Sequence, residues 1–227
     1  MSYNDQKIGL LDNLTDSVRY FRALGFFSEE AKWSDADLTQ SIIGEKQEAS
    51  LSISLPSITE KLVREDRGDP EFDCIIWRSI RPRPDYLDWK LVSRDKSWVW
   101  WEDGEGDITP GDEAYVRTLM AWCRISRGTF LPTNVREVWH KPIAWPKCKV
   151  KLEFLLNGRK KVLEPWDSFG WINYSLIESI NKLISKTGFA YYSFDTQDQT
   201  TGLVVLTSEE KHRLVEERDW KISGDDG

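Results

Sequence analysis

The chain has 227 residues, of which 40% are hydrophobic and 30% are charged. This composition supports one large or two small domains with an apolar core, and it excludes a disordered chain. The net charge of −7 comes from residues 1–140, because residues 141–227 hold equal numbers of acidic and basic side chains. An acidic first part argues against a general nucleic-acid binder, which needs a basic face, and favours a partner with a basic surface.

Residues 1–145 are predicted to mix helices with strands. Apolar residues at helical spacing predict helices, and runs rich in aromatic and β-branched residues predict strands. Ser34 is expected to cap the second helix, and Asp95-Lys96 to turn two strands into a hairpin. The expected helices cover residues 11–25, 34–43, 57–65, 112–127 and 133–139, and the expected strands cover residues 51–55, 72–78, 89–93 and 98–101.

Residues 146–227 are predicted to form a ββαββα unit. A first strand over residues 150–156 alternates apolar with mostly polar side chains, and Asn157-Gly158 follows as a hairpin turn. A two-residue turn there places Leu152 opposite Leu163 and Lys151 opposite Glu164. Beyond the hairpin we expect a helix capped by Asn173 or Ser175, strands over residues 189–194 and 203–206, and a last helix opened by the capping box of Thr207 and Glu210.

These elements together predict an α+β fold in which helices cover a mostly antiparallel sheet. Pro142 and Pro146 mark the expected boundary between a Trp-rich, acidic N-terminal region, residues 1–145, and the ββαββα unit, residues 146–227.

A cytoplasmic location is expected from the cysteines and from the start of the chain. Cys74, Cys123 and Cys148 are odd in number and widely spaced, which is typical of a reducing compartment rather than of a disulfide framework. The first residues lack the basic and then apolar pattern of a signal peptide. No apolar run approaches the roughly 20 residues of a membrane helix, so we expect a soluble protein without membrane contact.

The main candidate site is an acidic, Trp-rich segment. Strand alternation predicts that Trp98 and Trp100 share one sheet face and that Trp101 lies on the other. An exposed tryptophan beside carboxylates is typical of a protein-binding hot spot. We therefore expect a non-catalytic bacterial module, of the immunity type or regulatory, that binds a basic partner protein and no cofactor. The predicted partner-binding residues are Trp98, Trp100, Trp101, Glu102, Asp103, Glu105 and Asp107.

The same acidic segment does not match a calcium loop, because Ile108 stands where an EF-hand that begins at Asp103 requires glycine. A metal-dependent nuclease or other hydrolase is the main alternative: Asp73 and Asp88 would hold Mg²⁺ and Lys90 would steady the attacking hydroxide. Cys148 and His140 are a conceivable nucleophile and base that no pattern positions.

A basic hairpin leaves a further function open. Basic strands can carry nucleic acid, although lysines on an edge strand also protect against aggregation, which is the interpretation we favour. The basic residues concerned are Lys141, Lys147, Lys149, Lys151, Arg159, Lys160 and Lys161.

Overall fold

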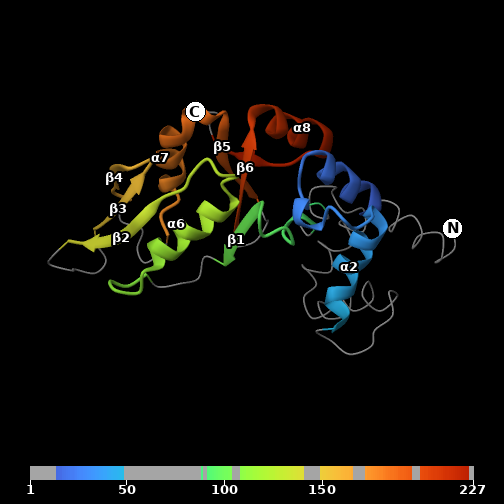
Figure 1. Cartoon of the computed structure of the whole chain (residues 1–227), viewed down its shortest axis with the longest axis horizontal. Coiled ribbons are helices and arrows are strands. Elements are labelled where there is room, and N and C mark those ends of the chain that lie inside the picture. The colour runs from blue at the N-terminus through green and yellow to red at the C-terminus, as the bar shows by residue number, and fades with distance from the viewer. Residues whose placement is uncertain are drawn as a thin grey trace, which may run out of the picture. The chain divides into compact units, whose positions relative to one another are not determined.

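The computed structural model describes residues 14–48, 88, 91–103, 108–140, 149–165, 172–195 and 200–224. The chain divides into two compact units, residues 1–94 and residues 95–227. Helices and two antiparallel sheets make up the fold, which confirms the α+β prediction (Figure 1). The predicted boundary after residue 145 falls inside the second unit. The elements predicted over residues 51–55, 57–65 and 72–78 lie outside the described residues.

The first unit contains the two helices that the sequence predicts at its start. Residues 14–23 are helical, and α2 (Asp35–Glu48) follows the short helix η1 (Ser28–Glu30). The Ser34 hydroxyl accepts the backbone N–H of Asp37 at 3.1 Å, and the Asp37 carboxylate accepts the backbone N–H of Ser34 at 3.3 Å. This reciprocal pair satisfies N–H groups that the helix leaves unbonded, so Ser34 caps α2, as predicted.

The segment before residue 95 differs from the prediction. Asp88, Leu91 and Val92 have helical backbone, so the strand predicted over residues 89–93 is wrong. A short apolar run has no clear period, and its β-branched and aromatic residues suit a buried helical turn as well as a strand. Asp95 then turns the chain into one strand rather than closing a hairpin, because its carbonyl accepts the N–H groups of Trp98 and Val99.

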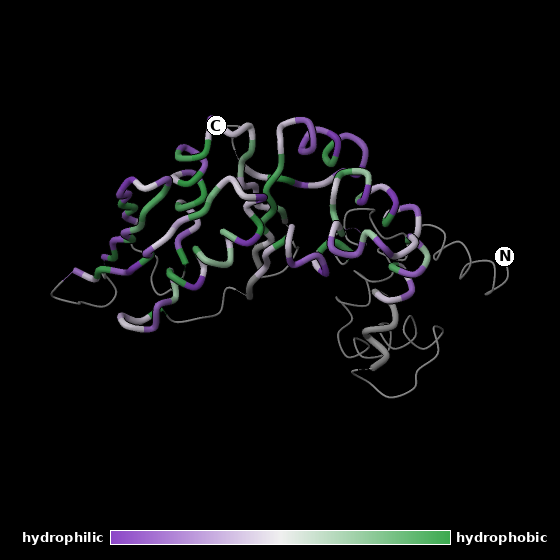
Figure 2. The backbone as a smooth tube through the Cα atoms, viewed as in Figure 1, coloured by the Kyte–Doolittle hydropathy of each residue, from purple (hydrophilic) through white to green (hydrophobic). Residues whose placement is uncertain are grey.

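A four-stranded antiparallel sheet lies at the centre of the second unit, in the order β1 (Val99–Asp103), β6 (Thr200–Thr207), β5 (Phe189–Asp195) and β7 (Ile222–Ser223). The inner strand β6 is apolar from Leu203 to Leu206, where it is buried on both faces (Figure 2). Leu203 and Val205 on one face and Val204 and Leu206 on the other are all 0% exposed.

Helix α8 (Ser208–Arg218) packs against β6 and is mostly polar on its solvent side. The Thr207 side chain accepts the backbone N–H of Glu210 at 3.2 Å, and the Glu210 carboxylate accepts the N–H of Thr207 at 2.8 Å. The predicted capping box is therefore confirmed. Leu214 is the fully buried residue of α8, and it anchors an otherwise hydrophilic helix to the sheet.

The second sheet confirms the predicted hairpin. Its order is β2 (Thr133–Trp139), β3 (Val150–Leu156) and β4 (Arg159–Leu163). Asn157 and Gly158 have φ of 52° and 72°, the left-handed values that a two-residue hairpin turn requires. Leu152 pairs with Leu163, as predicted. Across the next pair of positions, the Lys151 ammonium lies 2.8 Å from the Glu164 carboxylate.

Strand β2 occupies the segment that the sequence assigned to a helix over residues 133–139, so that prediction is wrong. Val135, Glu137 and Trp139 are half-buried and alternate with exposed residues, which is the period of a strand. Asn134 has φ of 54° and lies where the register with β3 shifts. The pairing edge of β3 decides the conformation of β2, and such long-range pairing cannot be read from local helix signals.

One apolar core joins both sheets with α6 (Ala114–Ile125) and α7 (Ser175–Ile184). Both helices were predicted, and Gly128 and Gly188 follow them with positive φ. Strands from both sides of residue 145 contribute to this core, so residues 146–227 do not bury it alone. The largest fully buried core side chains include Leu119, Trp122, Phe130, Leu152, Phe154, Ile180 and Tyr191.

Gly202 in β6 lies directly beneath the Phe194 ring. A Cβ atom at residue 202 would stand 2.2 Å from the ring atom Cζ of Phe194, far inside van der Waals contact. We expect Gly202→Ala to lower the free energy of unfolding by about 1–3 kcal/mol, the usual cost of overpacking. Urea denaturation measures this change. Adding Phe194→Leu should make the alanine less costly, and an unchanged urea midpoint for Gly202→Ala would contradict the contact.

Candidate functional site

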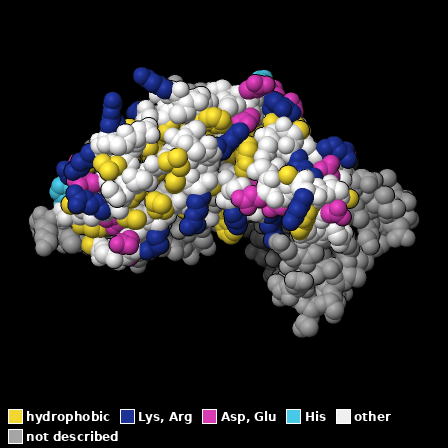
Figure 3. All heavy atoms as spheres, viewed as in Figure 1, with side chains coloured by type: hydrophobic (Ala, Val, Ile, Leu, Met, Phe, Trp, Pro, Cys, Tyr) yellow, Lys and Arg dark blue, Asp and Glu magenta, His cyan; other side chains and the backbone are white. Residues whose placement is uncertain are grey.

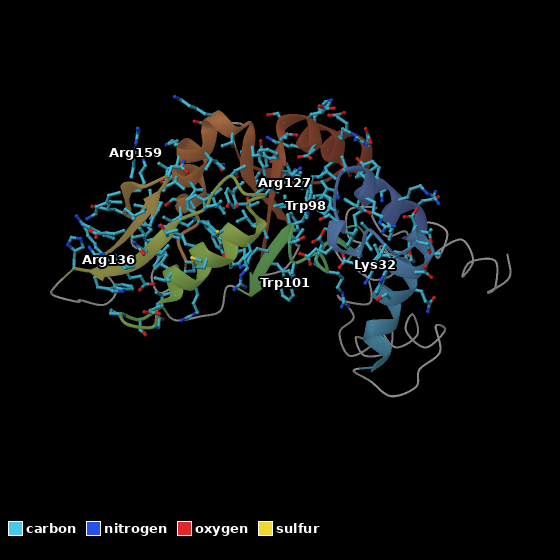
Figure 4. The ribbon with its side chains drawn as sticks, in the orientation of Figure 1. Lys32, Trp98, Trp101, Arg127, Arg136 and Arg159 are labelled. Carbon is cyan, nitrogen blue, oxygen red and sulfur yellow. The ribbon has the colours of Figure 1, made fainter. Side chains whose placement is uncertain are left out.

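Trp101 is the exposed tryptophan of β1. Its side chain is 40% exposed, and its partner across the ladder is Gly202, which has no side chain to pack against it. The Lys96 ammonium lies over the indole, 4.7 Å from the ring centre. Figure 4 shows Trp101 on β1, apart from the neighbouring Trp98 and Arg127. The ring therefore offers apolar area and already holds a cation.

The backbone of Trp101 faces the open edge of the sheet. Strand β1 pairs with β6 on one side, and no strand in the described part of the chain pairs with its other side. The N–H of Val99 donates to the Asp95 carbonyl at 2.9 Å, so it points away from β6. Because alternate residues of a strand direct their polar groups to the same side, the N–H and C=O of Trp101 also point to the open edge.

Trp98 and Trp100 pack into the interior of the second unit. Trp98 is 7% exposed, and the Arg127 guanidinium carbon lies 4.0 Å from the centre of its ring. Trp100 packs partly buried against the core and meets the Trp122 ring edge-on, with ring centres 5.7 Å apart. The structure thus places Trp100 and Trp101 on opposite faces of β1, as alternation predicts, and leaves Trp101 as the one accessible to a partner among these three.

The predicted acidic residues are placed only in part. Glu102 and Asp103 belong to β1 by their backbone, but their side chains lie outside the described part of the structure, as do Glu105 and Asp107 entirely. Their role in binding a partner stays a prediction. Asp112, further along the same segment, has a structural role, because its carboxylate accepts the N–H groups of Thr109 and Ala114 at 2.9 Å each.

Two carboxylates make tertiary contacts within the second unit that the sequence did not predict. Glu137 of β2 accepts the backbone N–H of Val116 at the start of α6, 3.1 Å away, and the indole N–H of Trp139. The Arg127 guanidinium donates from Nη1 to both carboxylate oxygens of Glu210, at 2.9 and 2.7 Å. No sequence pattern links these residues, because each pair is brought together by the tertiary fold.

The nuclease alternative loses the strand on which it depends. Asp88 is helical and 1% exposed, so it is not an accessible carboxylate at a strand end. Asp73 and Lys90 lie outside the described residues. Within the residues that the structure does describe, no three His, Cys, Asp or Glu side chains are grouped so that they could share a metal ion.

The thiol alternative, Cys148 with His140 as its base, has only one of its two residues in the described part of the structure. Cys148 lies outside the described residues, and the backbone N–H of His140 bonds to the Lys149 carbonyl. Burial raises the pKa of the half-buried Cys123 thiol, although the positive charge of Arg124 opposes this shift. A raised pKa leaves less of the nucleophilic thiolate at neutral pH.

Two of the seven basic residues of the hairpin, Lys151 and Lys160, form ion pairs with carboxylates. On the outward face of the three-stranded sheet, the Glu153 carboxylate binds Arg136 and, at 3.2 Å, Lys160, while Glu164 binds Lys151. Figure 3 shows Lys and Arg side chains at this end of the unit with acidic side chains among them, and Figure 4 places Arg136 and Arg159 there. The pattern fits edge-strand protection better than a nucleic-acid surface.

The pKa of Glu153 provides a test of this charge pairing. The hydrogen bond from Arg136, followed by that from Lys160, lowers the pKa of the Glu153 carboxyl from its ordinary value. Stability from this carboxylate is therefore present above its unfolded-state pKa and is lost as the pH falls through its lower folded-state pKa. We expect Arg136→Ala to raise the Glu153 pKa in an NMR titration.

Glu164 is the internal control, because Lys151 lowers the pKa of that carboxyl independently of Arg136. In Arg136→Ala the Glu164 titration should stay where it is in the wild type. If the two carboxyls shifted together, or if neither moved, the assigned pairing would be incorrect.

None of the helices in the described part of the chain combines the length and the apolar character that crossing a bilayer requires. Comparison with known proteins gives no match: no family model fits the chain, and no curated protein and no solved structure is significantly similar to it.

Proposed function

We propose that this chain is a non-catalytic protein-binding module that recognises its partner through the surface of β1 centred on Trp101. The observation that carries the proposal is a 40% exposed indole on an edge strand. Tryptophan buries a large area at a small cost in conformational entropy, and it is enriched among the residues that dominate binding energy.

The expected partner has a basic surface. The chain carries a net charge of −7, and Glu102 and Asp103 follow Trp101 directly in the sequence. Complementary charge speeds the encounter of two proteins and suppresses wrong partners. A role of the immunity type, in which the module neutralises its partner, or a regulatory role in the cytoplasm of a bacterium, suits this chemistry.

Site-specific photo-crosslinking tests the proposal. A benzophenone amino acid replaces Trp101 in one variant and Trp33 in a second, and both variants are irradiated in cells of the native host. Trp33 is 38% exposed and belongs to the other unit, so it is a matched control for an exposed tryptophan. We expect a discrete covalent adduct with one protein from position 101 alone. Adducts from neither position, or the same adducts from both, would refute the proposed surface.

A further inference from the structure

Trp101 combines three features that together specify how a partner would bind. Its backbone N–H and C=O face the open edge of β1, its ring is exposed, and the ring carries a Lys ammonium. We propose that the partner supplies an extended basic segment, which pairs with β1 as an added strand and lays a Lys or Arg side chain on the Trp101 ring. This inference rests on the proposed function and names its ligand chemistry.

The backbone contribution follows from the position of β1 in the sheet. An edge strand presents a row of N–H and C=O groups that another extended chain can pair with, and many peptide-binding proteins use such an edge. Within the described residues, no hydrogen bond reaches the outward N–H and C=O of Trp101. The opposite sheet edge is different, because β7 pairs with Ser193 and Phe194, and the Asn181 side chain bonds to Tyr191.

The chemistry of the partner's side chain follows from Lys96. Its ammonium lies 4.7 Å from the centre of the Trp101 ring, within the distance at which a cation and an indole attract each other. A cation brought by a partner takes the same place, so Lys96 acts as an intramolecular competitor. Removing the Lys96 charge should therefore strengthen binding, whereas loss of an ordinary interface contact weakens it.

A second copy of the chain is a less suitable occupant of the edge. Two copies of a chain with a net charge of −7 repel each other, and β1 contributes no basic residue to a ladder with itself. A basic segment places opposite charges along the same ladder.

Hydrogen exchange of the whole 227-residue chain tests the inference with three short synthetic peptides. One peptide alternates lysine with valine, one alternates glutamate with valine, and the third is the lysine peptide with N-methyl groups on alternate backbone nitrogens. We expect the lysine peptide to protect the outward-facing amide of Trp101, and the other two peptides to leave it unprotected. Trp101→Ala should abolish the protection, and Trp33→Ala should retain it.

Lys96→Met gives the sharpest outcome, because it removes the charge and leaves the apolar stem. A cation on an exposed ring accounts for a change of about two- to fivefold, so the variant should bind the lysine peptide about two- to fivefold more tightly in calorimetry. The inference would be overturned by any of three exchange results: equal protection by the lysine and glutamate peptides, protection by the N-methylated peptide, or no protection by any peptide. Weaker binding of the lysine peptide to Lys96→Met, or β1-mediated dimers in light scattering, would also overturn it. If a crosslink forms at position 101 and any of these results is also found, the partner binds at Trp101 but not by strand addition.

Discussion

Asn181→Leu is expected to lower the free energy of unfolding by about 2–6 kcal/mol, because it orphans two buried backbone groups at about 1–3 kcal/mol each. The Asn181 side chain is 6% exposed, donates its Nδ2–H to the Tyr191 carbonyl at 2.9 Å and accepts the Tyr191 N–H at 2.7 Å. It thereby acts as a strand partner for β5 beyond the end of β7. Leucine has the same number of side-chain heavy atoms and the same branching at Cγ, so the loss reports on hydrogen bonding rather than on a cavity.

Urea denaturation followed by far-UV circular dichroism measures this change. Lys182→Leu is the matched control, because Lys182 is the next residue of α7 and is exposed. A surface change of this kind should stay within about 0.5 kcal/mol of the wild type. Equal stabilities of the two leucine variants would show that the Asn181 amide does not support the edge of β5.

Arg127→Met is expected to lower the free energy of unfolding by about 2–4 kcal/mol, somewhat less than the loss of one partner from a fully buried ion pair. The Arg127 guanidinium lies between Trp98 and Phe189, 4.0 and 4.6 Å from their ring centres, and donates to Glu210. The Arg127 and Glu210 side chains are only 23% and 16% exposed. Methionine preserves the apolar stem but leaves the Glu210 carboxylate without its cationic partner.

Two further variants separate charge from geometry. Arg127→Lys keeps the charge but lacks the planar guanidinium, so it should recover only part of the lost stability. Arg124→Met, at an exposed position of α6, should change stability by less than about 0.5 kcal/mol. Full stability of Arg127→Met would contradict a role for this cluster in joining the start of β1 to α8.

The parts of the fold that the sequence predicted are those with local signals. Asn157-Gly158 sets a two-residue turn, and the turn alone fixes the pairing of Leu152 with Leu163. Thr207 and Glu210 form a capping box within one helical turn, so their spacing was sufficient to predict the start of α8.

The wrong predictions concern segments whose conformation is decided elsewhere in the chain. Strand β2 forms because β3 offers it a pairing edge, and Glu137 faces inward where it can cap α6. The backbone at Asp88, Leu91 and Val92 is helical although the local residues favour a strand. In both cases tertiary context overrides propensity.

The candidate site shows the same limit. Alternation correctly separated Trp100 from Trp101, but it could not say which of them is exposed. That depends on the packing of distant segments, since the residue opposite Trp101 is Gly202, about a hundred positions away in the sequence. The burial of Trp98 likewise depends on Arg127, which α6 and its following turn deliver to the start of β1.

The most direct test of a binding surface at Trp101 is the affinity of purified protein for the partner that the position-101 crosslink identifies. Dissociation constants are measured by calorimetry for the wild type, for Trp101→Ala and for Trp33→Ala. We expect Trp101→Ala to bind at least about tenfold more weakly, as loss of a central interface tryptophan does, and Trp33→Ala to bind like the wild type. Equal affinities for all three proteins would contradict the proposal that this chain recognises its partner through Trp101.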